Sequence, residues 1–178
     1  YASRTVIKNA YADKVSTSFY DQDIWALHAE KIKDAIQNGI TLYGEIVNQL
    51  PNNKWIQKNY DYGLPPGQSE LFIYRITYTK PDGDIVEYTT PQIQRYCQKY
   101  QLKTVPIFYY GRAKDKYPDL DTENHWHENF LAKLEETYLE KKCDLCKSDV
   151  WREGICLRID KPNSWVTTKL KCKNFLGY

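Results

Sequence analysis

Trp151-Arg-Glu-Gly-Ile-Cys-Leu-Arg-Ile159 and Val166-Thr-Thr-Lys-Leu-Lys-Cys-Lys-Asn-Phe175 are the two runs of sequence that decide the fold. Both alternate between apolar and polar residues, as half-buried strands do. The residues between them, 160–164, read Asp-Lys-Pro-Asn-Ser and predict a turn. The two runs should therefore pair as a hairpin.

Lysines gather on one face of the second run. Lys169, Lys171 and Lys173 would follow one another about 7 Å apart along an extended chain. Such a row has no packing role, but a polyanion opposite it would neutralise the charge. A carboxylate on the neighbouring strand could then hold a divalent metal ion. Strict alternation places Glu153 on that strand, on the same side as Ile155.

Length and charge limit the class of protein. A chain of 178 residues with 42% apolar residues can form one domain with its own core. The net charge of +2 gives no overall basic field, but no acidic residue follows Asp160, so the C-terminal segment is locally cationic. No run resembles a membrane span or a signal peptide, so we expect a cytoplasmic protein.

The cysteines favour reduced thiols. Their number, five, is odd, and they are scattered along the chain, which argues against a disulfide framework. Cys143-Asp-Leu-Cys146 could form a zinc site with His125 and His127. The two histidines diverge at the start of a predicted helix, however, and no second Cys-x-x-Cys pair exists. We therefore interpret these cysteines as free thiols.

The rest of the chain interleaves helices and strands. His28 should lie at the surface or boundary of the first helix, and Val105 to Tyr109 should form a short buried strand. Hairpins require antiparallel pairing, so we expect an α+β domain of antiparallel sheets flanked by helices. The predicted helices cover 21–38, 90–100 and a segment that starts at Asp121; the predicted strands cover 40–47, 70–78 and 84–89, with a long loop over 48–68.

Several of these segments resemble the motifs of ATP-dependent polynucleotide ligases. Glu153-Gly-Ile-Cys-Leu-Arg158 is similar to their motif IV (E-G-x-x-x-R), and Lys169-Leu-Lys171 is similar to motif V (K-x-K). Leu42-Tyr-Gly-Glu-Ile46 resembles motif III, Leu71-Phe-Ile-Tyr-Arg-Ile76 resembles motif IIIa, and Ser3-Arg4 resembles motif Ia. The motifs occur in family order. Motifs IV and V follow one another closely, as in the RNA ligases.

This resemblance implies that residues 1–178 are a nucleotidyltransferase (adenylylation) domain fragment of an ATP-dependent RNA ligase, with motifs Ia to V. It also implies roles for individual residues. Lys169 and Lys171 would hold the α-phosphate of ATP, and Glu153 would bind Mg²⁺. Glu45 would bind the ribose; the alternative is that it is a strand-end glutamate that only faces solvent. Tyr74, with Phe72 as the alternative, would stack on adenine, and Arg4 would reach a phosphate.

Lys80-Pro-Asp-Gly83 matches the nucleophile motif of ligases, K-x-D-G, but Pro-Asp-Gly between two alternating runs is ordinary turn chemistry. In ligases that motif also precedes motif Ia, whereas this match follows motif IIIa. We therefore expect the nucleophilic lysine upstream of Tyr1. The chain as given would then be unable to adenylylate itself.

The reaction implied by the resemblance transfers AMP from ATP to the 5′-phosphate of an RNA end, after which a 3′-hydroxyl attacks and expels AMP. RNA ends would be the partners, RNA repair the context, and a viral or phage origin would fit. A DNA ligase or a capping guanylyltransferase would share the chemistry. A non-catalytic nucleic-acid-binding module would keep the basic strand and the aromatic residues but would need no paired carboxylates.

Overall fold

Two antiparallel sheets form the framework of the structure, a computed structural model that describes residues 23–120 and 124–177. The larger sheet contains β1 (Ile40–Asn48), β2 (Ser69–Thr79), β3 (Ile85–Glu87) and β4 (Lys103–Thr104). All of its pairs are antiparallel except the short β2–β4 pair. The second sheet is the hairpin of β5 (Gly154–Lys161) and β6 (Ser164–Lys171). The predicted α+β class with antiparallel sheets is confirmed.

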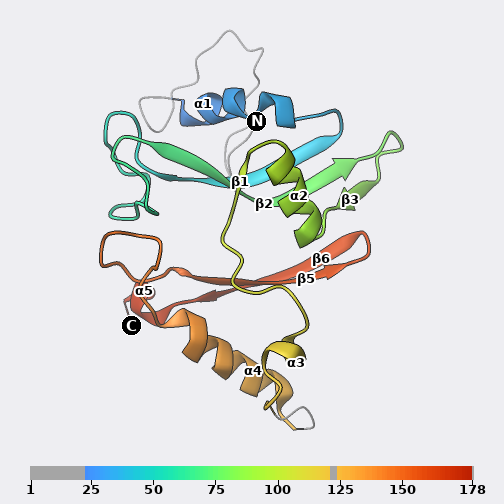
Figure 1. The fold of residues 1–178 in the computed structure, drawn as a ribbon, viewed down its shortest axis with the longest axis vertical. Helices are drawn as coiled ribbons and strands as arrows, with labels where there is room; N and C mark the ends of the chain where they lie inside the picture. The colour runs from blue at the N-terminus through green and yellow to red at the C-terminus, as the bar shows by residue number, and fades with distance from the viewer. Residues whose placement is uncertain (1–22, 121–123, 178) are drawn as a thin grey trace.

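The elements stack in layers, as Figure 1 shows. Helices α1 (Ile24–Lys31) and α2 (Thr90–Lys99) lie on one side of the larger sheet, and the β5–β6 hairpin lies on the other. Helix α4 (Trp126–Leu134) lies on the far side of the hairpin. The short elements are the 3-10 turn Lys33–Ala35, α3 (Ala113–Lys116), the π-helical turn Glu135–Leu139 and α5 (Lys173–Leu176). No helix of the described residues is long and apolar enough to cross a membrane.

A bulge in β2 determines which of its side chains lie on each face of the larger sheet. Tyr43 pairs with Arg75 and Gly44 pairs with Ile73, so Tyr74 has no partner on β1. The extra residue allows Ile73 and Ile76, three apart in sequence, to be buried in one cluster with α2. It also leaves Tyr74 exposed on the strand.

Helix α1 begins where the sequence predicts but is shorter. Asp23 caps it by accepting a hydrogen bond from the Ala26 N–H, 3.1 Å away. The prediction that His28 lies at the surface or boundary is wrong: its side chain is buried and its Nε2 lies 2.9 Å from the Ser69 Oγ. Burial, followed by the charge of Lys31, lowers the pKa of His28.

The C-terminal hairpin is confirmed, with a tighter turn and a shorter second strand than predicted. β6 ends at Lys171, and the next residues form α5, which Cys172 caps. Lys173 therefore leaves the strand, and its amine pairs with Glu135. The predicted row of three lysines is a pair, Lys169 and Lys171.

Three further segments test the sequence reading. The predicted turn at residues 80–83 is confirmed and joins β2 to β3; the Lys80 amine lies 3.4 Å from Asp84. The predicted start of a helix at Asp121 lies outside the described residues. The prediction of a short buried strand at Val105 to Tyr109 is wrong, because β4 ends at Thr104 and the rings that follow are exposed.

Candidate functional site

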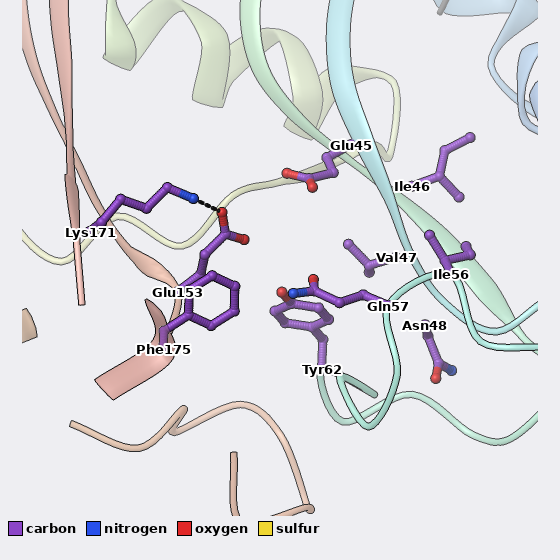
Figure 2. Close-up of a pocket in the computed structure, with 10 residues that line it drawn as sticks. All are labelled: Glu45, Ile46, Val47, Asn48, Ile56, Gln57, Tyr62, Glu153, Lys171 and Phe175. Carbon is purple, nitrogen blue, oxygen red and sulfur yellow. Dashed lines mark hydrogen bonds and ion pairs between the residues drawn. The ribbon is translucent and has the colours of Figure 1, made fainter. Parts of the chain in front are cut away.

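A cavity of about 380 Å³ opens between β1 and the C-terminal hairpin (Figure 2). One wall comes from β1, a second from the loop that follows it, and a third from the hairpin and α5. The lining includes two carboxylates, one lysine and two aromatic rings. The lining residues are Glu45, Ile46, Val47, Asn48, Ile56, Gln57, Tyr62, Glu153, Lys171 and Phe175.

Two lysines and one glutamate form a cluster at this cavity. The Glu153 Oε1 accepts hydrogen bonds from the Lys169 Nζ, at 2.6 Å, and from the Lys171 Nζ. Burial alone would raise the pKa of Glu153, but the two lysines outweigh it and hold this pKa below its ordinary value. Burial would likewise lower the pKa of Lys169, but the bond to Glu153 raises it. The cluster therefore carries a net positive charge, which suits an anionic ligand.

The backbone at Gly154 turns Glu153 toward the lysines. Strict alternation would place Glu153 beside Ile155, whose side chain packs in the cluster under α4, but β5 begins only at Gly154. Gly154 has φ +156° and pairs with Lys171. A Cβ at this position would lie 2.1 Å from the Leu170 carbonyl oxygen. The predicted side of Glu153 is therefore wrong, and only glycine fits after it.

Replacing Gly154 by alanine should lower the free energy of unfolding by roughly 2 kcal/mol or more, because the added methyl group collides with the Leu170 backbone. Urea unfolding followed by tryptophan fluorescence would measure the change. Gly83→Ala is the matched control, since Gly83 also has positive φ (+93°) but nothing lies within 4 Å of its missing Cβ. Equal losses in the two variants would refute the steric role of Gly154.

Glu45 faces the cavity from the opposite wall (Figure 2). Within residues 23–120 and 124–177 its carboxylate makes no hydrogen bond or ion pair, so it can accept from a ligand hydroxyl. The neighbouring Gly44 does not help a ligand to approach. A Cβ there would lie 2.7 Å from the Leu71 Cδ1 and 2.8 Å from the Phe72 carbonyl oxygen, so the glycine serves the packing of β1 on β2.

The rings that line the cavity are not those that the sequence indicates. Neither Tyr74 nor Phe72 belongs to the lining; Tyr62 and Phe175 do. Tyr62 has a left-handed backbone, φ +48°, and burial together with the charge of Glu45 raises its pKa. Burial and Glu45 also raise the pKa of Tyr74, so the Glu45 carboxylate acts on both tyrosines.

Glu140 holds α5, and with it Phe175, against the cavity. Its Oε1 accepts from the Lys173 N–H at 2.7 Å, and its Oε2 accepts from the Asn174 Nδ2 at 2.7 Å. The Lys173 N–H is the main cause that lowers the pKa of Glu140 from 4.5 to about 2. Lys173 is the second residue after β6, so Glu140 holds the chain just beyond the end of the strand.

This pKa predicts an acid-sensitive contact. The pKa of Glu140 is lower in the folded state, so its contribution to stability is full above pH 4.5 and is lost as the pH falls toward 2. The free energy of unfolding of the wild type should therefore fall more steeply over this range than that of Glu140→Gln. Urea titrations at several pH values would measure both slopes, and parallel slopes would contradict the assignment.

The described residues offer few ligands to a metal ion. In the parts of the chain that the structure describes, no three His, Cys, Asp or Glu side chains are grouped to hold a metal ion. All five cysteines are free. Glu153 uses only its Oε1 in the lysine cluster, so its Oε2 still faces no hydrogen-bond donor of the described residues.

The structure thus brings most of the predicted site together. Glu45, Glu153 and Lys171 line one cavity, and Lys169 shares the carboxylate oxygen of Glu153 with Lys171. Tyr74 lies outside the lining, and Arg4 lies outside the described residues. Tyr62, Gln57 and Phe175 were not predicted as site residues. The abundance of ring and amide residues in the loop over 48–68 is the one signal for Tyr62 and Gln57, and no signal singles out Phe175.

Comparison with known proteins adds one finding. The sequence profile of the RNA ligase family matches residues 3–173, which is nearly the whole chain. The matched range contains every residue that lines the cavity except Phe175. Searches of curated proteins and of solved structures found no match.

Proposed function

The chain belongs to the RNA ligase family, and we propose that the cavity binds ATP and transfers its AMP to the 5′-phosphate of an RNA end. The observation that carries this proposal is the convergence of Glu45, Glu153 and Lys171 on one cavity from three separate segments of the chain. A purely structural role would not require two carboxylates and a lysine to face an open space.

Lys169 and Lys171 would bind the α-phosphate. Both amines lie on one face of β6, and both point at the same carboxylate oxygen. A phosphate oxygen could replace that carboxylate oxygen and gain two charge-assisted hydrogen bonds. As negative charge develops during phosphoryl transfer, two fixed amines would stabilise it without reorganisation.

Glu153 would bind Mg²⁺, and the residues present fit this ion. Mg²⁺ is commonly held by one or two carboxylates together with substrate phosphates. The Glu153 Oε2 is available for this role, and the ion would neutralise charge on the phosphates. Removing divalent ions should therefore weaken ATP binding in the wild type more than in Glu153→Gln.

Glu45 would accept a hydrogen bond from a ribose hydroxyl, and the base would lie against a ring beside it. Tyr74 is the ring that motif IIIa indicates, and Tyr62 is the ring that lines the cavity. Stacking on a base contributes roughly 1–3 kcal/mol. Replacing each tyrosine by alanine would assign the base to the one whose loss weakens ATP binding. Arg4 would complete the site by contacting a phosphate.

Incubation of the full-length protein with α-³²P-labelled ATP tests the proposal. We expect a covalent AMP adduct, and joining of a 5′-adenylylated RNA to an RNA that has a free 3′-hydroxyl. The second reaction needs no nucleophilic lysine, because AMP is already on the RNA. Labelling by GTP alone would indicate a guanylyltransferase, and preference for a nicked DNA would indicate a DNA ligase. Failure of both reactions would refute the proposal.

A further inference from the structure

Four consecutive large apolar residues are exposed where the chain passes from the larger sheet to the hairpin. Ile107, Phe108, Tyr109 and Tyr110 keep between 38% and 56% of their surface accessible. The first three lie in the run predicted as a buried strand, Val105 to Tyr109. Among the residues that the structure describes, all four lie outside any strand and stay exposed. An exposed cluster of this kind marks a surface that contacts another molecule.

This segment connects the two sheets between which the candidate site lies. On the larger sheet, Glu45 pairs with Phe72 and Phe72 pairs with Lys103, so the three residues form a row from the cavity to β4. The exposed segment leaves β4 and crosses toward the hairpin (Figure 1). There the Arg152 guanidinium lies 4.7 Å from the Phe108 ring centroid, one residue before Glu153. The segment that carries the exposed rings therefore joins the sheet of Glu45 to the hairpin of Lys171.

Positive charge accompanies the rings. Arg112, Lys114 and Lys116 follow directly, and Asp115 is the only acidic residue among them. None of the three cations forms an ion pair with a carboxylate of the described residues. The Lys116 amine lies 5.3 Å from the Tyr109 ring centroid, so cations and rings share one surface. Exposed rings next to cations that have no carboxylate partner suit a single-stranded polyanion with flat bases.

The rings differ in how many contacts they make with other residues of the protein. Phe108 stacks on Tyr138 with ring centroids 5.3 Å apart, and the Tyr109 hydroxyl donates to the Arg112 carbonyl oxygen. Tyr110 is the most exposed of the four, and within residues 23–120 and 124–177 its ring has no aromatic, cationic or hydrogen-bonding partner. It is therefore the ring best placed to take a base.

We propose that residues 107–116 form a binding platform for single-stranded RNA beside the reacting end, with Tyr110 stacking on a base and Arg112, Lys114 and Lys116 contacting phosphates. The platform rests on the proposed function for the identity of its ligand as RNA. It would position the strand whose end enters the cavity, while ATP binding would depend on the cavity alone.

The test compares two affinities in the full-length protein: that for a fluorescein-labelled single-stranded RNA with a 3′-hydroxyl, by fluorescence anisotropy, and that for ATP. Tyr110→Ala should weaken RNA binding about tenfold and leave ATP binding unchanged. Tyr110→Phe keeps the ring and should stay within about twofold of the wild type. Ile85→Ala, which removes an equally exposed apolar side chain on β3, is the surface control and should have no effect.

The outcomes separate this proposal from the previous one. Unchanged RNA binding by Tyr110→Ala, with normal ATP binding, overturns the platform alone. Loss of self-association by Tyr110→Ala in size-exclusion chromatography, with unchanged RNA binding, would overturn it in favour of a protein contact. A wild type that binds RNA through Tyr110 but never binds ATP would support the platform and refute the proposed function.

Discussion

Replacing Lys171 by alanine should weaken ATP binding by about ten- to a hundredfold. The amine lines the cavity and would make a charge-assisted hydrogen bond to the α-phosphate, a contact that contributes about 1.5–3 kcal/mol. Joining of 5′-adenylylated RNA should slow at least as much, because charge builds up on that phosphate in the transition state. Isothermal titration calorimetry with ATP and a single-turnover joining assay would measure the two effects.

Lys173→Ala is the matched control for this prediction. Lys173 is only two residues away, but it follows the end of β6, and its amine pairs with Glu135 instead of Glu153. Its replacement should leave ATP affinity within about twofold of the wild type. If Lys171→Ala and Lys173→Ala bind ATP equally well, the phosphate role of Lys171 is excluded.

Replacing Arg158 by alanine should lower the free energy of unfolding by about 3 kcal/mol. The Arg158 side chain crosses from the hairpin to the larger sheet and is 15% exposed. Its Nη2 donates to the Tyr88 carbonyl oxygen at 2.6 Å, and its Nε donates to the Asp160 Oδ1 at 2.6 Å. Asp160 also accepts from the Thr90 N–H, at 2.7 Å, at the start of α2. The variant would leave a nearly buried carboxylate without its cation.

The same variant should weaken ATP binding, because Arg158 ties the hairpin, which forms one wall of the cavity, to the larger sheet, whose strand β1 forms another. Urea unfolding and ATP titration of Arg158→Ala and of Arg112→Ala would test this. Arg112 is exposed and forms no ion pair with the described residues, so its loss should cost less than about 0.5 kcal/mol. A stability loss below about 1 kcal/mol in Arg158→Ala would contradict the clamping role.

Alternation in the sequence predicts the C-terminal hairpin and the face on which Lys169 and Lys171 lie, because a strand has a period of two whatever it packs against. Motif order then relates this pair to Glu45, more than a hundred residues earlier. These local patterns are enough to identify four of the site residues that the structure brings together.

Other features depend on contacts that periodicity does not encode. The bulge at Tyr74 arises from the register between β1 and β2, and a run of alternating residues gives no sign of where an extra residue is inserted. The side of Glu153 depends on one backbone dihedral at Gly154. Tyr62 enters the cavity from a long loop, whose path is set by its tertiary contacts.

Short apolar runs are the other source of error. The residues 105–109 read as a buried strand because strands and exposed aromatic surfaces share the same composition at this length. Histidine often lies at the surface or boundary of a fold, but Ser69 gives His28 a hydrogen-bond partner in the interior. The exposure of residues 105–109 and the burial of His28 both depend on which residues pack against these side chains, and only the tertiary structure shows that.

A crystal structure of the protein with ATP tests the central claim most directly. We predict that the nucleotide occupies the cavity between β1 and the hairpin, with a ribose hydroxyl against Glu45 and the α-phosphate within hydrogen-bonding distance of the Lys169 and Lys171 amines. An ATP molecule bound elsewhere, with both lysines still paired to Glu153, would contradict the account.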